Sequence, residues 1–422
     1  MHSVTNAIPT GTIASIPAKA HAHRALICAA LANSPSTILL SRTSKDIDAT
    51  MDSLRGLGAH VVYENKVVTV TPGPVPAKGN VVPHESGTTL RLLLPVAASI
   101  CNDVDVDAKG RLPDRPLEPM LGEMKAHGVT FSQDKPPFTM TGRLQGGNFS
   151  MVGDVSSQFF SGLLLAAPQI GLSTITSTTP LQSSDYVTLT TETMRDFGVE
   201  VEHTLPDTNI NEAFTVPFGA SFIGRDNYQI EGDWSNAAIW MVAAGVTGKP
   251  ITITGMNKNS VQADRRIMQV MIDAGCDVVW DGMNITVTGR ASKPIHADLE
   301  QMPDMLPVMA ALACSISGES SFIKGARLRL KESDRLIAVA NLVRDLGGTV
   351  REEGDDLYII GSGILKGGHG DCVNDHRLVM AGTLMALISE NPVTLKDSEA
   401  ITKSYPDFFE DWNLLGGDAH GI

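Results

Sequence analysis

The sequence has no stretch of 18 consecutive apolar residues, so it predicts no membrane-spanning helix. Its opening segment, MHSVTNAIPTGTI, lacks the basic and apolar parts of an export signal, and we therefore expect no export. Basic residues are also in deficit, with 33 Lys and Arg against 47 Asp and Glu and a net charge of −14. That balance disfavours nonspecific nucleic-acid binding, but it leaves open a small anionic ligand held by a local basic cluster.

Cysteines are few, and their spacing suggests neither a disulfide framework nor a metal site. They are odd in number, widely scattered and never spaced as Cys-x-x-Cys: Cys28, Cys101, Cys276, Cys314 and Cys372. This usage is typical of a reducing cytoplasm, where we expect the protein to reside. The eleven histidines form no set with carboxylates or thiols at metal-ligand spacing, and P-loop, HExxH and GxSxG motifs are absent.

What the sequence does contain is a repeat. A helix-like stretch that ends in glycine and runs into a β-branched segment recurs six times, as in LRGLGAHV and MIDAGCDVV. The six glycines are Gly58, Gly128, Gly198, Gly275, Gly347 and Gly416, at spacings of 70, 70, 77, 72 and 69 residues. Such regular spacing indicates six copies of one supersecondary unit in which the glycine ends a helix.

Each copy also contains a second helical segment rich in small and apolar residues, such as 89–106. Apolar residues on nearly every face predict a buried helix, whereas the alternating pattern of 332–348 predicts a helix with one face in solvent. With three copies per domain, the 422 residues give two similar α/β domains that meet near 225–232. An open solenoid is the alternative, although solenoid repeats are usually shorter, at roughly 20–50 residues.

Unusual polar residues gather in the loops that precede the predicted buried helices. A helix N-terminus offers free N–H groups and a positive dipole end, so cations and hydroxyls there favour phosphate or carboxylate ligands. Ordinary helix capping by Ser, Thr or Asp is the alternative for any single loop. These residues are Lys19 and Arg24; Glu85, Ser86, Gly87, Thr88 and Arg91; Ser156, Ser157 and Gln158; Asp304; and Asn374, Asp375, His376 and Arg377.

The loops before the amphipathic helices carry a second set of polar residues. Its densest group is 331–335, which a plain helix start would also explain, with Glu332 paired to Arg335 one turn later. The set comprises Asp46, Arg111, Arg115, Ser183, Tyr186, Lys331, Glu332, Arg335 and Lys403.

Together these segments resemble the 3-phosphoshikimate 1-carboxyvinyltransferase (EPSP synthase) family across nearly the whole chain. The similar segments include PAKAHAHRALICAALA (17–32), GRLPDRPLEPM (110–120), GDVSSQFFSGLLLAAP (153–168), RLRLKESDRL (327–336) and KSYPDFFEDW (403–412). The resemblance implies a two-domain inside-out α/β barrel of six βαβαββ-type repeats, three per domain, that closes over its substrates. It also implies that residues 1–18 join 230–422 in the C-terminal domain, leaving 19–229 as the N-terminal domain.

The family reaction transfers the enolpyruvyl group of phosphoenolpyruvate to the 5-hydroxyl of shikimate 3-phosphate and releases phosphate. The resemblance implies Asp304 as general base, Glu332 as general acid and Lys19 as a partner in proton transfer. It assigns shikimate 3-phosphate to Lys19, Ala20, Arg24, Ser156, Ser157, Gln158, Ser183, Tyr186, Asp304 and Lys331, and phosphoenolpyruvate to Lys19, Gly87, Arg115, Gln158, Arg335, Arg377 and Lys403. It requires no metal or organic cofactor, and we expect a monomer with small-molecule substrates and no nucleic-acid or membrane partner.

Four positions depart from the family pattern, and two other functions stay open. Ala18-Lys19-Ala20 stands where the family commonly has Ser-Lys-Ser, while Glu85 and Arg327 each stand where many members have Asn. One alternative is UDP-N-acetylglucosamine enolpyruvyl transferase, but its family carries a Cys in the loop equivalent to 108–116, which has none. The other is a noncatalytic anion-binding paralogue, against which the joint presence of an acid and a base argues.

Overall fold

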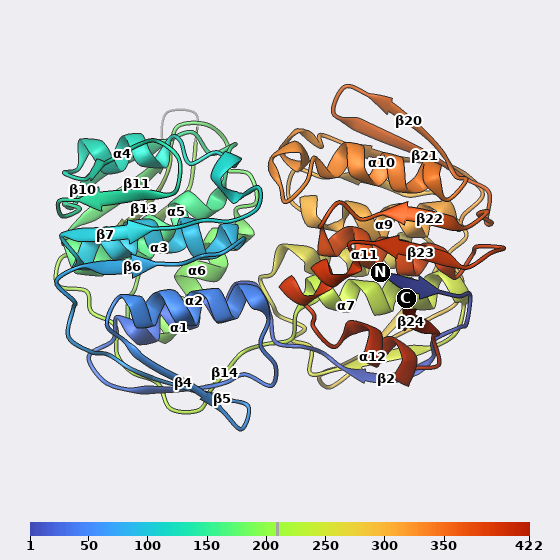
Figure 1. The fold of residues 1–422 in the computed structure, drawn as a ribbon, viewed down its shortest axis with the longest axis horizontal. Coiled ribbons are helices and arrows are strands. Elements are labelled where there is room, and N and C mark those ends of the chain that lie inside the picture. Colours follow the sequence, from blue (N-terminus) through green and yellow to red (C-terminus); the bar gives the residue numbers. More distant parts are fainter. Residues whose placement is uncertain (208–210) are drawn as a thin grey trace. The chain divides into compact units, whose positions relative to one another are not determined.

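The computed structural model describes residues 1–207 and 211–422, and its chain divides into two compact units (Figure 1). The N-terminal unit is Pro17–Ile230, and the C-terminal unit is Met1–Ile16 together with Glu231–Ile422. Compactness alone does not show that each unit folds independently, so the domain limits 19–229 and 1–18 with 230–422 stay a prediction. Within the described residues, no helix has the length and apolar character needed to cross a membrane.

The described part of the N-terminal unit forms three four-stranded sheets, in the orders β14-β3-β5-β4, β6-β7-β9-β8 and β10-β11-β13-β12. The strands are β3 (Ser36–Leu39), β4 (His60–Glu64), β5 (Val67–Thr71), β6 (Gly79–Val81), β7 (Asp103–Val106), β8 (Thr130–Phe131), β9 (Phe138–Thr141), β10 (Gly147–Met151), β11 (Ser173–Ser177), β12 (Glu202–Thr204), β13 (Glu212–Val216) and β14 (Tyr228–Gln229). The helices are α1 (Lys19–Ala30), α2 (Lys45–Gly56), α3 (Gly87–Ile100), the 3₁₀ helix η1 (Leu112–Asp114), α4 (Met120–Ala126), α5 (Ser157–Ile170) and α6 (Asp185–Asp196).

The C-terminal unit also forms three four-stranded sheets among its described residues, in the orders β2-β15-β17-β16, β18-β19-β21-β20 and β22-β23-β1-β24. The strands are β1 (His2–Val4), β2 (Gly11–Ala14), β15 (Ile251–Thr254), β16 (Asp277–Asp281), β17 (Asn284–Thr288), β18 (His296–Asp298), β19 (Gly318–Ile323), β20 (Thr349–Glu353), β21 (Asp356–Gly361), β22 (Gly368–Asp371), β23 (Val393–Lys396) and β24 (Ala419–Gly421). The helices are α7 (Trp234–Thr247), η2 (Ala263–Arg266), α8 (Ile267–Asp273), η3 (Pro303–Met305), α9 (Leu306–Cys314), η4 (Ala326–Leu330), α10 (Arg335–Asp345), α11 (His376–Ala386), η5 (Ser398–Lys403) and α12 (Phe408–Leu414).

All six sheets share one pairing pattern, in which a parallel pair of strands is followed by two antiparallel pairs. In the pairs β6–β7, β10–β11, β18–β19 and β22–β23, the connection between the parallel strands contains a helix. A parallel pair needs such a crossover, because a tight hairpin reverses the chain. The fold is therefore α/β with mixed sheets, whereas the inside-out barrel stays a prediction.

The first residues of the chain belong to two sheets of the C-terminal unit. Strand β1 lies between β23 and β24, with Ser3 opposite Thr394 on one side and His420 on the other. Strand β2 pairs in parallel with β15, which places Ile13 opposite Ile253. Both pairings join segments separated by more than two hundred residues of sequence.

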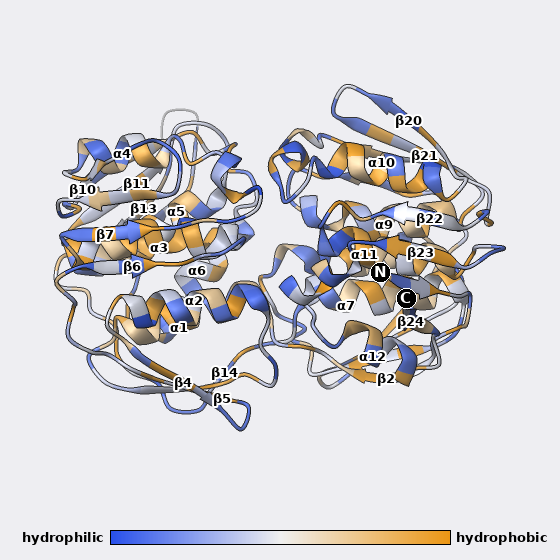
Figure 2. Ribbon diagram, viewed as in Figure 1, coloured by the Kyte–Doolittle hydropathy of each residue, from blue (hydrophilic) through white to orange (hydrophobic). Residues whose placement is uncertain are grey.

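Two kinds of helix fill the units, as the periodicity predicts. Helix α7 buries 12 of its 14 residues, and the continuous apolar sequence around Trp240 leaves no face for solvent. Helix α10 buries 7 of its 11 residues and exposes Ile337, Asn341, Arg344 and Asp345. Figure 2 shows this contrast between the largely orange α3 and the mixed colours of α10.

Positive backbone dihedrals confirm that the six repeat glycines end their helices. All six glycines have φ between +85° and +103°, in the left-handed region that favours glycine. In α2, for example, Gly58 donates its N–H to the Arg55 carbonyl at 3.0 Å and closes the last turn. The chain can then leave the helix directly for a strand.

Helices α3 and α5 pack so closely that one glycine is required between them. A Cβ atom on Gly162 would lie 2.5 Å from the Arg91 carbonyl oxygen and 3.2 Å from Pro95 Cγ. We expect Gly162→Ala to lower the free energy of unfolding by about 1–3 kcal/mol, the usual cost of overpacking. Urea unfolding followed by circular dichroism measures the change.

The matched control is Gly122→Ala in α4, where the added Cβ would meet only the Glu118 carboxylate at 3.1 Å. Because alanine favours the helix by about 1 kcal/mol over glycine, this substitution should leave stability unchanged or increase it. Equal losses for the two variants would contradict the proposed packing.

Candidate active site

In the N-terminal unit, the first residue of α1 forms an ion pair with the first turn of α2. Lys19 Nζ lies 2.7 Å from Asp46 Oδ2, with side chains 19% and 13% exposed. Ser44 caps α2 by accepting a hydrogen bond from the Ile47 N–H. The Asp46 carboxylate therefore lies where the helix dipole stabilises negative charge, and it holds Lys19 at a partly open position.

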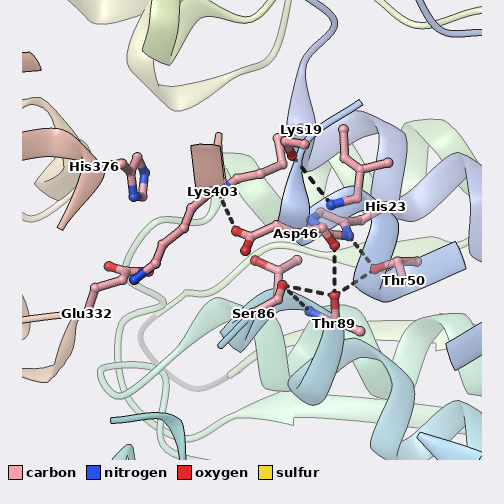
Figure 3. A network of polar contacts seen from close by, with 12 residues as sticks. Lys19, His23, Asp46, Thr50, Ser86, Thr89, Glu332, His376 and Lys403 are labelled. Carbon is pink, nitrogen blue, oxygen red and sulfur yellow. Dashed lines mark hydrogen bonds and ion pairs between the residues drawn. The ribbon is translucent and has the colours of Figure 1, made fainter. Parts of the chain in front are cut away.

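A buried chain of hydrogen bonds, made by two threonine hydroxyls and a histidine, leads from the backbone of Asp46 into the unit (Figure 3). Thr89 Oγ1 of α3 lies 3.3 Å from the Asp46 carbonyl oxygen and 2.7 Å from Thr50 Oγ1 of α2. Thr50 Oγ1 in turn lies 2.6 Å from His23 Nδ1 of α1. Burial, and then the charges of Lys19 and Arg24, hold the pKa of His23 well below its usual range, so this imidazole is neutral at neutral pH. The network fixes the starts of three helices relative to one another.

Arg24 lies one turn further along α1 and is buried. It donates Nε to Thr190 Oγ1 at 2.7 Å and Nη2 to the Tyr186 carbonyl at 3.0 Å, which ties α1 to α6. Nη1 donates to the carbonyl of Ala20 at 2.7 Å. Burial lowers the pKa of Arg24 to about 10, which still leaves the guanidinium charged at neutral pH. A buried cation bonded to neutral oxygens suits an anionic ligand, and the assignment of Arg24 to shikimate 3-phosphate stays a prediction.

The start of α5 is tied to the start of α3. Gln158 donates Nε2 to Thr88 Oγ1 at 2.9 Å and accepts from Arg91 Nη1 at 3.2 Å. Ser156 is the N-cap of α5, and both it and Ser157 are buried. Three of the predicted ligand residues thus share one helix start.

Gly87, the first residue of α3, leaves room for an arginine. A Cβ at this position would lie 2.5 Å from Arg115 Nη1, so glycine allows the guanidinium to lie against the helix start. Ser183 and Tyr186 lie at the beginning of α6, where Ser183 takes a positive φ of 54°. The N-terminal unit therefore brings its predicted site residues to the starts of α1, α3, α5 and α6.

In the C-terminal unit, Arg335 lies at the centre of a buried ionic cluster. Its side chain is 1% exposed and donates to Asp304 Oδ1 at 2.7 Å, to Glu332 Oε2 at 2.5 Å and to Asp375 Oδ2 at 2.9 Å. Lys331 Nζ also contacts Asp304 Oδ1, at 3.0 Å. The predicted acid and the predicted base therefore share one arginine.

The remaining predicted cations join this cluster through the start of α11. Asp375 caps that helix by accepting the Arg377 N–H at 2.9 Å, and Arg377 Nη1 donates to the Ser235 carbonyl at 3.1 Å. Lys403 donates Nζ to the Asn374 carbonyl at 2.8 Å. All six predicted site residues of the C-terminal unit thus lie around the starts of α10 and α11 and the helix η3.

Electrostatics keep the cluster ionised. Burial by itself would raise the pKa of Asp304, but Lys331, Arg335 and Arg377 together outweigh burial and lower it. Burial would lower the pKa of Arg335, whereas the carboxylates, Asp375 first, raise it above its ordinary value. In this arrangement Asp304 is a carboxylate with little affinity for a proton, because surrounding cations stabilise its charge.

Two polar residues near this cluster, the buried Asp264 and the half-buried Ser235, carried no sequence signal. Asp264 sits in the charged segment ADRR, which reads as an exposed helix start, yet it is 1% exposed. Ser235 lies in the first turn of α7 and donates its hydroxyl to Asp264 Oδ2. Only the three-dimensional packing of η2 against α7 reveals either residue.

The chain is similar to known proteins of one family over nearly its whole length. The family described as EPSP synthase (3-phosphoshikimate 1-carboxyvinyltransferase) matches residues 7–412. The chain belongs to the EPSP synthase family. Among curated relatives, the 3-phosphoshikimate 1-carboxyvinyltransferase of Clostridium kluyveri is 36% identical over 97% of this chain and 95% of its own length. That of Methanocorpusculum labreanum is 34% identical over 97% of each chain.

Solved structures support the same fold at lower identity. EPSP synthase from Acinetobacter baumannii superposes with a TM-score of 0.80 at 22% identity, covering 100% of this chain and 99% of that one. The resemblance inferred from the sequence motifs is therefore confirmed. The role of each site residue stays a prediction, since family membership does not assign roles residue by residue.

Removal of Arg335 should destabilise the C-terminal unit, because Asp375 would keep a buried and uncompensated charge. We expect Arg335→Gln to lower the free energy of unfolding by about 3–5 kcal/mol, and a second change, Asp375→Asn, to restore part of it. Urea unfolding of both variants measures these values.

Arg329 provides a matched control, since it also pairs with two carboxylates, Asp334 and Asp355, but on the surface. Arg329→Gln should cost about 1 kcal/mol or less. A cost for Arg335→Gln no larger than this would contradict the ionic cluster described above.

Proposed function

We propose that this chain transfers the enolpyruvyl group of phosphoenolpyruvate to the 5-hydroxyl of shikimate 3-phosphate and releases phosphate. One observation carries the proposal: Asp304 and Glu332 contact the same buried arginine, at 2.7 and 2.5 Å. Asp375 already compensates the buried Arg335, so a chain that only bound anions would not need two further carboxylates at the partly exposed positions of Asp304 and Glu332. Two fixed carboxylates in a cationic cluster suit an addition–elimination that needs both a base and an acid.

In the proposed addition, Asp304 accepts the proton of the 5-hydroxyl while the oxygen bonds to C2 of phosphoenolpyruvate. Glu332 supplies a proton to C3, which turns the methylene into a methyl group and leaves a tetrahedral adduct. In the elimination, the Glu332 carboxylate takes a proton back from the methyl group while the C–O bond to phosphate breaks, which restores the enol double bond. Protonation of the enol phosphate supplies the electrophile, so the scheme requires no metal or organic cofactor.

Substrate binding should activate the proposed base. In the ligand-free cluster, Lys331, Arg335 and Arg377 lower the pKa of Asp304 despite its burial. If Lys331 takes the phosphate of shikimate 3-phosphate, and Arg335 and Arg377 take phosphoenolpyruvate, part of that positive charge is neutralised. The proton affinity of Asp304 then rises with each substrate and is highest when both are present.

For the N-terminal unit we propose the assignments that the family motifs imply. Shikimate 3-phosphate would contact Arg24 and the serines of α5 and α6, and phosphoenolpyruvate would contact Lys19, Arg115 and the backbone at Gly87. The helix starts that carry these residues support the proposal, because free N–H groups and the helix dipole favour anions. Ala20 supplies no hydroxyl, so its family contact is absent unless water replaces it.

We also propose that the chain acts as a cytoplasmic monomer with the inside-out barrel fold. All five cysteines are buried and free, which suits a reducing compartment. The identical pairing pattern of the six sheets supports three equivalent repeats in each unit.

The first test is substrate choice. Phosphate release from phosphoenolpyruvate should require shikimate 3-phosphate and should not occur with UDP-N-acetylglucosamine, because the loop 108–116 contains no cysteine. A coupled phosphate assay measures both reactions. Release with the nucleotide sugar alone would select the rival enolpyruvyl transferase, and release with neither would favour a noncatalytic binder.

The second test addresses the acid and the base. Asp304→Asn and Glu332→Gln should each lower kcat by roughly 10²-fold or more while binding of both substrates is largely retained, the usual scale for losing a general acid or base. The surface carboxylates Asp298 and Glu352, which pair with Lys324 and Arg344, provide matched controls. Near-normal turnover of either active-site variant would refute its assigned role.

A further inference from the structure

Asp264 is a buried carboxyl group that the proposed mechanism does not use. It lies in η2 of the C-terminal unit and is 1% exposed. Oδ2 accepts the Ser235 hydroxyl, while Oδ1 is buried and has no hydrogen-bond partner among the described residues. A carboxylate with an unsatisfied buried oxygen is costly, so its retention beside an ionic cluster calls for a reason.

The surroundings of Asp264 connect it to Arg377. Ser235, whose hydroxyl contacts Asp264, accepts Arg377 Nη1 at its own backbone carbonyl, at 3.1 Å. The turn that carries Ser235 is fixed independently, since Asp233 caps α7 through the Asn236 N–H at 2.8 Å. Gln262, two residues before Asp264, accepts the Trp234 N–H at 3.0 Å. Two residues near η2, Gln262 and Asp264, thus hold the first turn of α7 in place.

The charges around Asp264 are mixed. Burial raises its pKa to about 6, and the nearby charge of Asp304, with a smaller effect from Asp233, acts in the same direction. Arg377 and the Ser235 hydroxyl act in the opposite direction. These four groups come from η3, α11 and the start of α7, so three elements outside η2 contribute to the protonation of Asp264.

We propose that Asp264 is a positioning residue for the anion site at Arg377. Its carboxyl group holds the turn at Ser235, whose carbonyl accepts the Arg377 guanidinium. When Asp264 is ionised, it competes with an incoming anion for the positive charge of Arg377. The inference rests on the proposed function, in which Arg377 binds phosphoenolpyruvate. An anion at Arg377 adds negative charge beside Asp264 and Asp304. Asp264 then takes up a proton, because burial and the charge of Asp304 already raise its pKa.

The sign of the pH dependence follows from this linkage. Phosphoenolpyruvate binds better when Asp264 is neutral, so binding should weaken as pH rises above about 6, the free-state value. For each pKa unit by which the bound ligand raises the pKa of Asp264, the Kd of the ionised form is tenfold higher than that of the neutral form. The phosphate group of the ligand titrates in the same pH range. Its effect on Kd is the same for wild type and Asp264→Asn, so it cancels when the two pH profiles are subtracted.

Asp264→Asn keeps the shape of the side chain and an acceptor for Ser235, but it cannot become charged. Calorimetric titration with phosphoenolpyruvate between pH 5.5 and 8 should give a Kd for the variant about 3–10-fold lower than wild type at pH 8, and equal within twofold at pH 5.5. In buffers of different ionisation enthalpy, wild type should take up more protons than the variant near pH 6.5. Asp273→Asn, at an exposed position in α8, is the matched control and should behave as wild type.

Ser235→Ala provides a second test that does not depend on the folding of Asp264→Asn. It removes the hydroxyl that lowers the pKa of Asp264 and leaves the carbonyl that receives Arg377. The pH at which binding begins to weaken should therefore move upward, which a purely structural role of Ser235 would not cause.

The possible outcomes distinguish the role of Asp264 from the binding of phosphoenolpyruvate at Arg377. Parallel pH profiles for wild type and Asp264→Asn, or an unshifted profile for Ser235→Ala, would overturn the role of Asp264 and leave the proposed function intact. Wild type that fails to bind phosphoenolpyruvate at any pH would overturn the assignment of this ligand to Arg377, and the inference with it.

Discussion

The C-terminal unit depends on how one buried guanidinium is compensated. A guanidinium presents its donors in one plane, and burying it without anionic partners is prohibitively costly. Arg335 meets this requirement with carboxylates from three separate segments, Asp304 before α9, Glu332 before α10 and Asp375 before α11. The starts of those helices must therefore converge, and the convergence gathers the proposed acid, the proposed base and several cations around Arg335. Stability and the proposed chemistry rest on the same contacts.

The N-terminal unit also brings helix starts together, but it does so mainly with uncharged groups. Its helix starts are joined by hydroxyl groups, such as Thr50 and Thr89, and by the neutral imidazole of His23. These neutral groups add no net charge, so we propose that a ligand meets mainly the N–H groups of the helix starts and the cations Lys19 and Arg115. The ionic unit is suited to moving protons, while the hydroxyl-rich unit is suited to orienting phosphate and carboxylate groups.

Local features of both units could be predicted from the sequence, and long-range contacts could not. Repeat spacing identified the glycines that end helices, and helical geometry predicted the contact of Glu332 with Arg335 one turn later. The contact of Arg335 with Asp375 spans 40 residues, and that of Thr50 with Thr89 spans 39. Periodicity cannot say which helix starts meet. Asp264 was missed for a related reason, since burial of a charged residue depends on packing that no local pattern records.

Strand β1 also constrains the order in which the protein assembles. Residues 2–4 lie between β23 and β24, and residues 11–14 lie beside β15. Synthesis delivers these short segments first, yet their partners leave the ribosome only after the whole of Pro17–Ile230. The opening segment must therefore wait unpaired while the N-terminal unit folds, and the last sheet closes only when Ala419–Gly421 is released. Completion of the C-terminal unit thus depends on segments from both sides of the N-terminal unit in the sequence.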